Sequence, residues 1–83
     1  IILLFIYTLY TMKKIKKIKI KLNGKAKVII ENLKIINLIS DLKIPVKKVA
    51  IELNAEIIDK KKLNKIKLKD GDQIEIVHFI GGG

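Results

Sequence analysis

The C-terminal segment, residues 70–83, holds the residues whose types and spacing best suggest chemistry. It consists of Asp70-Gly71-Asp72, then Gln73-Ile74-Glu75-Ile76-Val77-His78-Phe79-Ile80, then Gly81-Gly82-Gly83. Glycine has no side chain, so three glycines make a rod that is narrow enough to enter a tunnel. Fully extended, residues 79–83 span about 17 Å at roughly 3.3–3.6 Å per residue. The α-carboxylate of Gly83 can therefore reach another protein's active site while the folded body stays outside.

The same glycines have a plainer interpretation. Chain ends are commonly disordered, and short glycine tails can be remnants of cloning. The glycines alone leave this alternative open.

The other ionisable residues of this segment are poor candidates for catalysis. Asp70 and Asp72 flank Gly71, and this pattern is typical of a turn rather than of a pair of catalytic acids. His78 is the single histidine, and the chain has no cysteine that could share a metal with it or act as a nucleophile. We expect no catalytic residue and no metal site.

The charge of the chain is strongly positive, with a formal net charge of +10, and all eighteen basic residues are lysine. Such a charge permits binding to nucleic acid. Arginine, which makes bidentate contacts with phosphate and guanine, is absent. The abundance of Ile and Asn suggests a coding bias toward A and T, so we interpret the lysines as solvated surface and expect no nucleic-acid partner.

Residues 1–11 form an apolar run that precedes Met12. The run is much shorter than the ~20 residues of a membrane-spanning helix, and it lacks the basic region and cleavage site of a secretory signal. Because Met12 resembles a start, we expect residues 1–11 to be a leader outside the fold and residues 12–83 to form one small domain. We expect no membrane partner, although a short hydrophobic anchor stays open as an alternative.

The segment after the leader predicts a β-hairpin. Lysine alternates with Ile18, Ile20 and Leu22, which places these three side chains toward a core. Asn23-Gly24 is a strong signal for a two-residue type I′ turn. On the returning strand we expect Ala26, Val28 and Ile30 to share the core side.

A helix and three strands are predicted to follow. Apolar residues at helical spacing are Ile35, Leu38, Ile39 and Leu42, with Asn32 as the expected cap and Pro45 as the stop. Residues 49–53 predict a strand with Val49, Ile51 and Leu53 on one face, followed by a turn at 54–55 and a short strand at 56–58. A lysine-rich connection, residues 59–68, should bury Leu63, Ile66 and Leu68 and contain a single helical turn. Residues 73–78 predict the last strand.

The order β-β-α-β-β-β resembles the α+β ubiquitin-like β-grasp fold, with a mixed sheet of about five strands crossed by one main helix. Residues 49–54, 56–58 and 70–83 are similar to the ThiS family, the sulfur carrier proteins of thiazole formation in thiamine biosynthesis. Ala55 departs from that family, in which the turn usually has Gly. Because Asn54 can adopt a left-handed conformation, we expect the hairpin to survive.

This resemblance implies that the chain is a consumed and regenerated co-substrate rather than an enzyme. A ThiF-like adenylating enzyme of the ubiquitin-activating type would use ATP and magnesium to adenylate the carboxylate of Gly83. A persulfide donor would then convert it to a thiocarboxylate, which passes sulfur to a ThiG-like thiazole synthase. Gly82 and Gly81 would form the flexible tail. The protein would bind no cofactor and would be a monomer when free.

Three residues before the tail are candidates for partner binding. Phe79 and Ile80 suit an apolar contact at a tunnel mouth, although simple packing at the end of the last strand is an equal alternative. His78 is included, although a plain strand residue is its more ordinary role. The implied location is the cytoplasm, or the plastid stroma if the gene is in an organelle.

Three other functions stay open. The small subunit of molybdopterin synthase is a sulfur carrier with the same tail chemistry. A ubiquitin-like modifier would be joined to lysines of other proteins. A basic RNA-binding module would show salt-sensitive binding, but aromatic residues suited to base stacking are scarce here.

Overall fold

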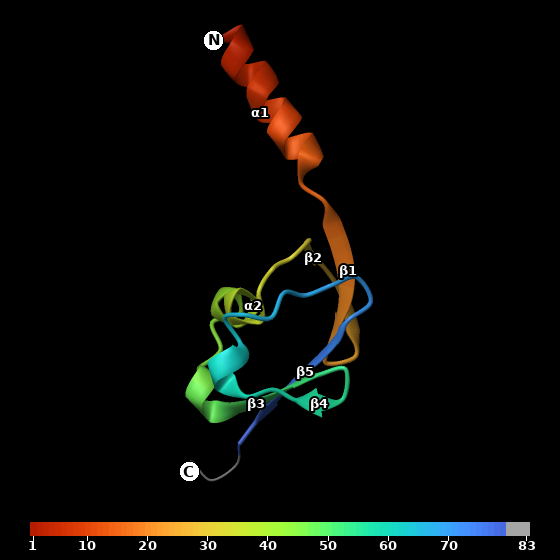
Figure 1. The fold of residues 1–83 in the computed structure, drawn as a ribbon, viewed down its shortest axis with the longest axis vertical. Coiled ribbons are helices and arrows are strands. Elements are labelled where there is room, and N and C mark those ends of the chain that lie inside the picture. The colour runs from red at the N-terminus through yellow and green to blue at the C-terminus, as the bar shows by residue number, and fades with distance from the viewer. Residues whose placement is uncertain (80–83) are drawn as a thin grey trace.

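The computed structural model describes residues 1–79, except for the side chains of residues 12–14. Its helical elements and strands, in chain order, are α1 Ile2–Lys14, β1 Lys17–Leu22, β2 Lys25–Ile30, α2 Ile35–Asp41, η1 Val46–Lys48, β3 Val49–Leu53, β4 Glu56–Ile57, η2 Lys60–Lys62 and β5 Gln73–His78. The elements η1 and η2 are single turns of 3₁₀-helix. Helix α1 projects from one end of the body, and α2 crosses the sheet (Figure 1). The predicted order of strands and main helix is confirmed, and α1 is an additional helix that contains most of the apolar run 1–11.

The five strands form one mixed sheet in the order β2-β1-β5-β3-β4. The pair β1–β5 is parallel, and the other three pairs are antiparallel. The last strand in the sequence is therefore the central strand of the sheet. Two hairpins, β1–β2 and β3–β4, lie on either side of it.

The first hairpin corrects the prediction for strand β2. Ile29 is buried there, whereas Val28 and Ile30 are 58% and 48% exposed and Ala26 is also exposed. The two-residue turn at Asn23-Gly24 fixes the register, and this register pairs Ile29 with the buried Ile18. Residues directly opposite each other in an antiparallel pair share a face of the sheet. The face of β2 is thus set by its partner strand.

Helix α2 has the predicted apolar side, since Ile35, Leu38 and Ile39 are fully buried. The predicted cap at Asn32 is wrong. The N-cap is Lys34, which makes no side-chain capping bond, while Asn32 lies in the preceding turn with φ +64°. A helix of seven residues is too short to be stable alone, so its burial against the sheet must hold it in place.

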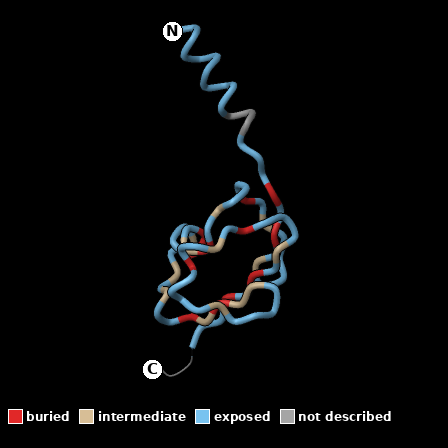
Figure 2. Tube along the Cα trace, viewed as in Figure 1, coloured by how far each residue is buried: buried red, intermediate tan, exposed pale blue. Residues whose placement is uncertain are grey.

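The core lies between α2 and the sheet. Its buried residues are Ile18, Ile20, Ile29, Ile35, Leu38, Ile39, Val49, Ile51, Leu63, Leu68, Ile74 and Ile76. Leu63 and Leu68 come from the lysine-rich connection, as predicted, and Ile66 is half-buried. Figure 2 shows buried positions throughout the body and none among residues 2–11 of α1. The core is therefore built without the first helix.

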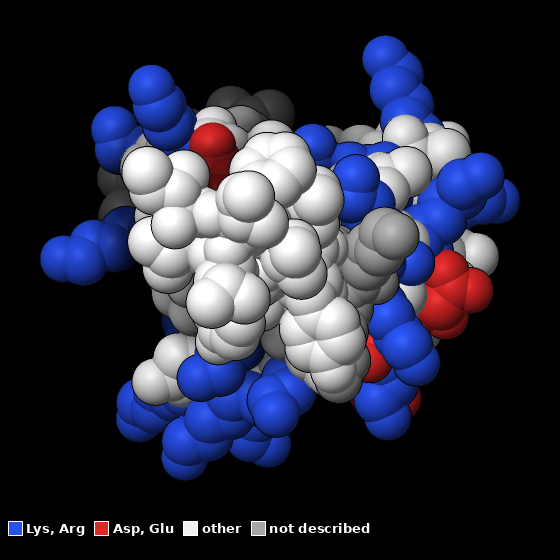
Figure 3. Space-filling view, turned by 90° about the horizontal axis from the view of Figure 1, so that it is seen from above, with Lys and Arg blue, Asp and Glu red and all other residues white. Residues whose placement is uncertain are grey.

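Lysine dominates the charged surface. Viewed along the long axis from the side of α1, lysine side chains surround an uncharged central area, and acidic groups are few (Figure 3). The excess of eighteen lysines over eight acidic residues gives the net charge of +10.

Candidate functional site

Strand β5 carries the chain toward the glycine tail. It pairs with β3 over five positions, from Val49↔His78 to Leu53↔Ile74, and with β1 through Lys21↔Gln73 and Leu22↔Ile74. Its own residues Ile74 and Ile76 have side chains buried in the core. Because bonds on both edges and burial on one face all hold β5, its exit point is fixed relative to the body.

Asn23 extends the hydrogen bonding of β5 beyond the end of β1. Its backbone N–H donates to the carbonyl oxygen of Ile74 at 2.9 Å. Its side-chain Oδ1 accepts from the N–H of Ile76 at 2.7 Å, and its Nδ2 donates to the carbonyl oxygen of Ile76 at 3.4 Å. A side-chain amide thus replaces the peptide group that another strand residue would supply.

Asn54 makes similar contacts from the opposite side of β5. Its backbone N–H donates to the carbonyl oxygen of Gln73 at 2.8 Å, and its Oδ1 accepts from the N–H of Gln73 at 2.9 Å. Its Nδ2 donates to Oδ1 of Asp72 at 3.1 Å. Both asparagines have a left-handed backbone, with φ +49° at Asn23 and φ +51° at Asn54. Sequence reasoning identified both as turn residues and missed these bonds to β5.

The two aspartates before β5 are turn residues, as predicted. Oδ1 of Asp70 accepts from the N–H of Lys19 at 2.8 Å, and Oδ2 of Asp72 accepts from the N–H of Lys69 at 2.8 Å. Gly71 has φ +86°, a conformation that favours glycine. Their carboxylates hold backbone amides, so they are not arranged as an acid and base.

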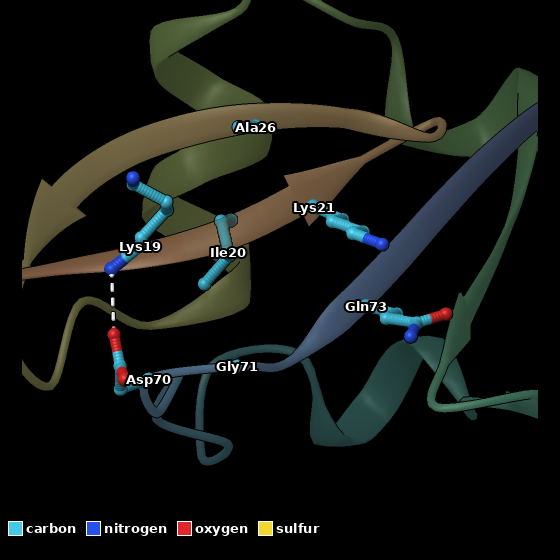
Figure 4. Close-up of a pocket in the computed structure, with 7 residues that line it drawn as sticks. All are labelled: Lys19, Ile20, Lys21, Ala26, Asp70, Gly71 and Gln73. Atoms are coloured by element: carbon cyan, nitrogen blue, oxygen red, sulfur yellow. Dashed lines mark hydrogen bonds between the residues drawn. The ribbon is translucent and has the colours of Figure 1, made fainter.

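A shallow hollow of about 260 Å³ lies beside this turn, and Figure 4 shows the residues that line it, including Lys19, Asp70 and Gln73. The carboxylate of Asp70, which lines the hollow, already accepts a hydrogen bond from the backbone N–H of Lys19. Within residues 1–79, no three His, Asp or Glu side chains are close enough together to hold a metal ion. The hollow offers neither a nucleophile with its base nor a metal site.

The end of β5 brings two predicted partner-binding residues to the surface. His78 and Phe79 are both exposed. The N–H of Phe79 donates to the carbonyl oxygen of Lys48 at 2.9 Å, which extends the pairing with the β3 side by one residue. The Lys60 ammonium lies 5.2 Å from the centroid of the Phe79 ring, a cation–π contact worth about 0.5–1 kcal/mol at an exposed site. Ile80, Gly81, Gly82 and Gly83 lie outside the described residues.

Comparisons with known proteins agree on one family. The ThiS family model matches residues 20–83. The chain is 45% identical over 47 residues to the sulfur carrier protein ThiS of Bacillus subtilis, covering 57% of this chain and 71% of that protein. It is 37% identical over 65 residues to a thiazole synthase of Paramagnetospirillum magneticum, covering 78% of this chain and only 20% of that protein.

A solved structure extends this similarity to the fold. The crystal structure of the thiamine biosynthesis protein ThiS from Geobacter metallireducens has a TM-score of 0.72 and 33% sequence identity. The match covers 80% of this chain and 100% of that one. The predicted β-grasp fold and the predicted family resemblance are both confirmed.

Proposed function

The chain belongs to the ThiS family, and from this premise we propose that it carries sulfur on the α-carboxylate of Gly83 during thiamine biosynthesis. Membership places it among small carrier proteins rather than enzymes. The observation that carries the proposal is the position of β5. This strand is central and bonded on both edges, and it ends at His78, next to the exposed Phe79, with Ile80 between Phe79 and the glycine sequence.

The chemistry begins from a poor acyl donor. A carboxylate has no good leaving group, so an oxygen of Gly83 must first attack the α-phosphorus of ATP and release pyrophosphate. The resulting acyl adenylate has AMP as its leaving group. A persulfide sulfur then attacks the acyl carbon and displaces AMP, and reductive cleavage of the acyl disulfide by a thiol leaves a thiocarboxylate. ATP and magnesium are bound by the adenylating enzyme, and this chain supplies only the acyl group.

The body has the role of presenting the tail. A partner that accepts residues 81–83 in a narrow tunnel must dock on the surface around the end of β5. Phe79 lies there with its ring half-exposed, beside Lys60 of η2 and the backbone of Lys48. We assign Phe79, Ile80 and His78 to this docking contact, with Gly81 and Gly82 inside the tunnel.

The acceptor that we propose is a thiazole synthase. Proteins of that name from Paramagnetospirillum magneticum and Magnetococcus marinus each contain a segment similar to this chain, at 37% and 47% identity. The chain spans about a fifth of the first and a tenth of the second. In these two proteins a segment similar to a sulfur carrier is part of a longer chain named thiazole synthase. This arrangement supports a thiazole synthase as the acceptor of the sulfur.

The test is sulfur loading with a purified adenylating enzyme, ATP, magnesium and a persulfide donor, followed by intact mass. The full chain should exchange one terminal oxygen for sulfur. One alanine added after Gly83 should abolish loading, because the reactive carboxylate moves out of register with the active site. The matched control carries the same alanine before Ile1 and should load normally, and circular dichroism should be unchanged in both. Loading of the C-terminally extended chain at the normal rate would contradict the mechanism.

Complementation separates thiazole formation from the molybdopterin alternative. The gene should restore growth of a thiazole-requiring strain that lacks its own carrier, and it should fail in a strain that lacks the molybdopterin carrier. The opposite result would keep the tail chemistry and change the pathway.

A further inference from the structure

Helix α1 exposes large apolar side chains on every side. Residues 2–7 are consecutive and each is at least 55% exposed, and Leu9 and Tyr10 are 42% and 54% exposed. Successive residues of an α-helix are about 100° apart, so a consecutive run of this kind surrounds the whole helix. Soluble monomers rarely expose a contiguous apolar patch larger than a few hundred Å². This surface therefore needs something to cover it.

The body of the protein does not cover it. The helix extends away from the sheet at the start of β1 (Figure 1), and none of its described positions is buried (Figure 2). The described core residues all lie between residues 18 and 76, outside α1.

The distribution of apolar residues distinguishes between possible occupants. A second copy of the helix, or a groove on another protein, would cover one stripe of α1 and leave the opposite side in water. A helix that is apolar all round is typical of a surrounding apolar medium. Lipid chains surround a helix completely, and this favours a membrane.

The order of residues along the segment also matches a membrane surface. Ile2 to Ile6 are aliphatic or aromatic, Tyr7 and Tyr10 follow, and the exposed lysines Lys16, Lys17, Lys19 and Lys21 come next. Tyrosine is enriched at the boundary between lipid and water, and lysines near the surface attract anionic headgroups. Viewed along the long axis from the α1 end, lysines lie around the uncharged central area, where α1 is seen end-on (Figure 3).

The described part of the helix is shorter than a bilayer is thick. Thirteen residues span roughly 20 Å at 1.5 Å each, against about 30 Å for the hydrocarbon core of a bilayer. No helix among the described residues has the length and hydropathy needed to cross a membrane. We propose that α1 inserts into the hydrocarbon of an anionic membrane and holds the carrier body at the membrane surface. The expectation of no membrane partner rested on the shortness of the apolar run 1–11, and a short apolar helix can still insert into lipid.

The test is flotation of the full chain with vesicles of phosphatidylcholine, with and without phosphatidylglycerol. The chain should float with the anionic vesicles. Its partition coefficient should fall at least tenfold on the neutral ones, because several lysines each contribute several-fold to binding. A chain that stays in the aqueous phase with both vesicle types would overturn the proposal.

A matched pair of variants locates the binding surface. Phe5→Asp/Ile6→Asp should lower the partition coefficient by about 100-fold or more, because a carboxylate is strongly disfavoured in hydrocarbon. Val28→Asp/Ile57→Asp introduces the same charge at positions of similar exposure on the sheet, 58% and 74%, and should float like the unchanged chain. Equal loss of binding in both variants would overturn the assignment to α1.

The two tyrosines provide a native reporter, because both lie in α1 and the chain has no tryptophan. Brominated lipid should quench their fluorescence in anionic vesicles. Absence of quenching in vesicle-bound protein would contradict insertion. A second result would also contradict insertion. It is an oligomer, detected by light scattering without lipid, that is lost in Phe5→Asp/Ile6→Asp and does not bind vesicles.

Discussion

The turn at Asn23-Gly24 and the turn at Asn54-Ala55 have nearly the same backbone. Each begins with an asparagine near φ +50°, and each continues with a second positive φ, +82° at Gly24 and +71° at Ala55. Each asparagine also bonds the backbone of β5. The turns differ in the second residue, since alanine has a Cβ that disfavours this conformation by about 1–2 kcal/mol.

The comparison separates two contributions to the position of β5. The first is the side-chain amide, which both turns share and which joins each hairpin to the central strand. The second is backbone strain, which is present at Ala55 and absent at Gly24. The first hairpin combines the amide with an unstrained turn. The second keeps its amide in spite of the strain, so the bonds to β5 must outweigh it.

Loss of the Asn23 amide should have the largest effect. Asn23→Ala should lower the free energy of unfolding by about 2–3 kcal/mol, because the N–H of the buried Ile76 loses its acceptor and an alanine must adopt positive φ. Urea denaturation measures this difference. Asn23→Gly removes the amide and relieves the strain, so it isolates the bond. If Asn23→Gly is as stable as the unchanged protein, the amide does not hold β5.

Loss of the Asn54 amide should have a smaller effect. Asn54→Ala should cost about 1–2 kcal/mol, because its two side-chain bonds are exposed and water replaces them in part. The same urea titration measures it, with Asn54→Gly as the control for backbone strain. A loss larger than that of Asn23→Ala would reverse the ranking of the two hairpins.

Strain introduced into the first turn should cost less again. Gly24→Ala should lower stability by about 1 kcal/mol, because the φ of +82° disfavours a side chain. An added Cβ meets no atom within 4 Å, so the cost comes from the backbone alone. Thermal unfolding followed by circular dichroism checks this value. A neutral result would mean that the turn changes type without loss.

Relief of strain in the second turn should give the smallest change, and with the opposite sign. Ala55→Gly should stabilise the fold by about 0.5 kcal/mol, because relief of the strain exceeds the entropy cost of glycine in the unfolded chain. The double variant Gly24→Ala/Ala55→Gly should stay within about 0.5 kcal/mol of the unchanged protein if the two sites are independent. Destabilisation by Ala55→Gly alone would show that Ala55 is not strained.

Much of this fold could be predicted from periodic patterns in the sequence. The alternation in β1, β3 and β5 and the helical spacing in α2 identify their buried faces, because each pattern depends on one element alone. The face of β2 could not be found in this way, since Ile29 and Ile30 are adjacent apolar residues. The register of the two-residue turn determines which of them is buried. Applying that register to the already assigned Ile18 would have given the correct face.

The candidate site was predicted less completely. The position of Phe79 at the end of the last strand follows from the pattern of β5. The bonds of Asn23 and Asn54 do not, because they join residues 53 and 19 positions apart in the sequence. The contact of Lys60 with Phe79 likewise depends on how the long connection folds back. Such contacts are set by tertiary packing.

The place of β5 in the sheet has a consequence for synthesis of the protein. A ribosome releases the N-terminal residues first, so the two hairpins emerge before the strand that joins them. Until residue 78 has left the exit tunnel, the hairpins β1–β2 and β3–β4 lack β5, the strand that lies between them in the sheet. Prematurely terminated products then have no stable fold and are exposed to proteolysis. Cellular quality control would therefore remove those molecules that end before Phe79.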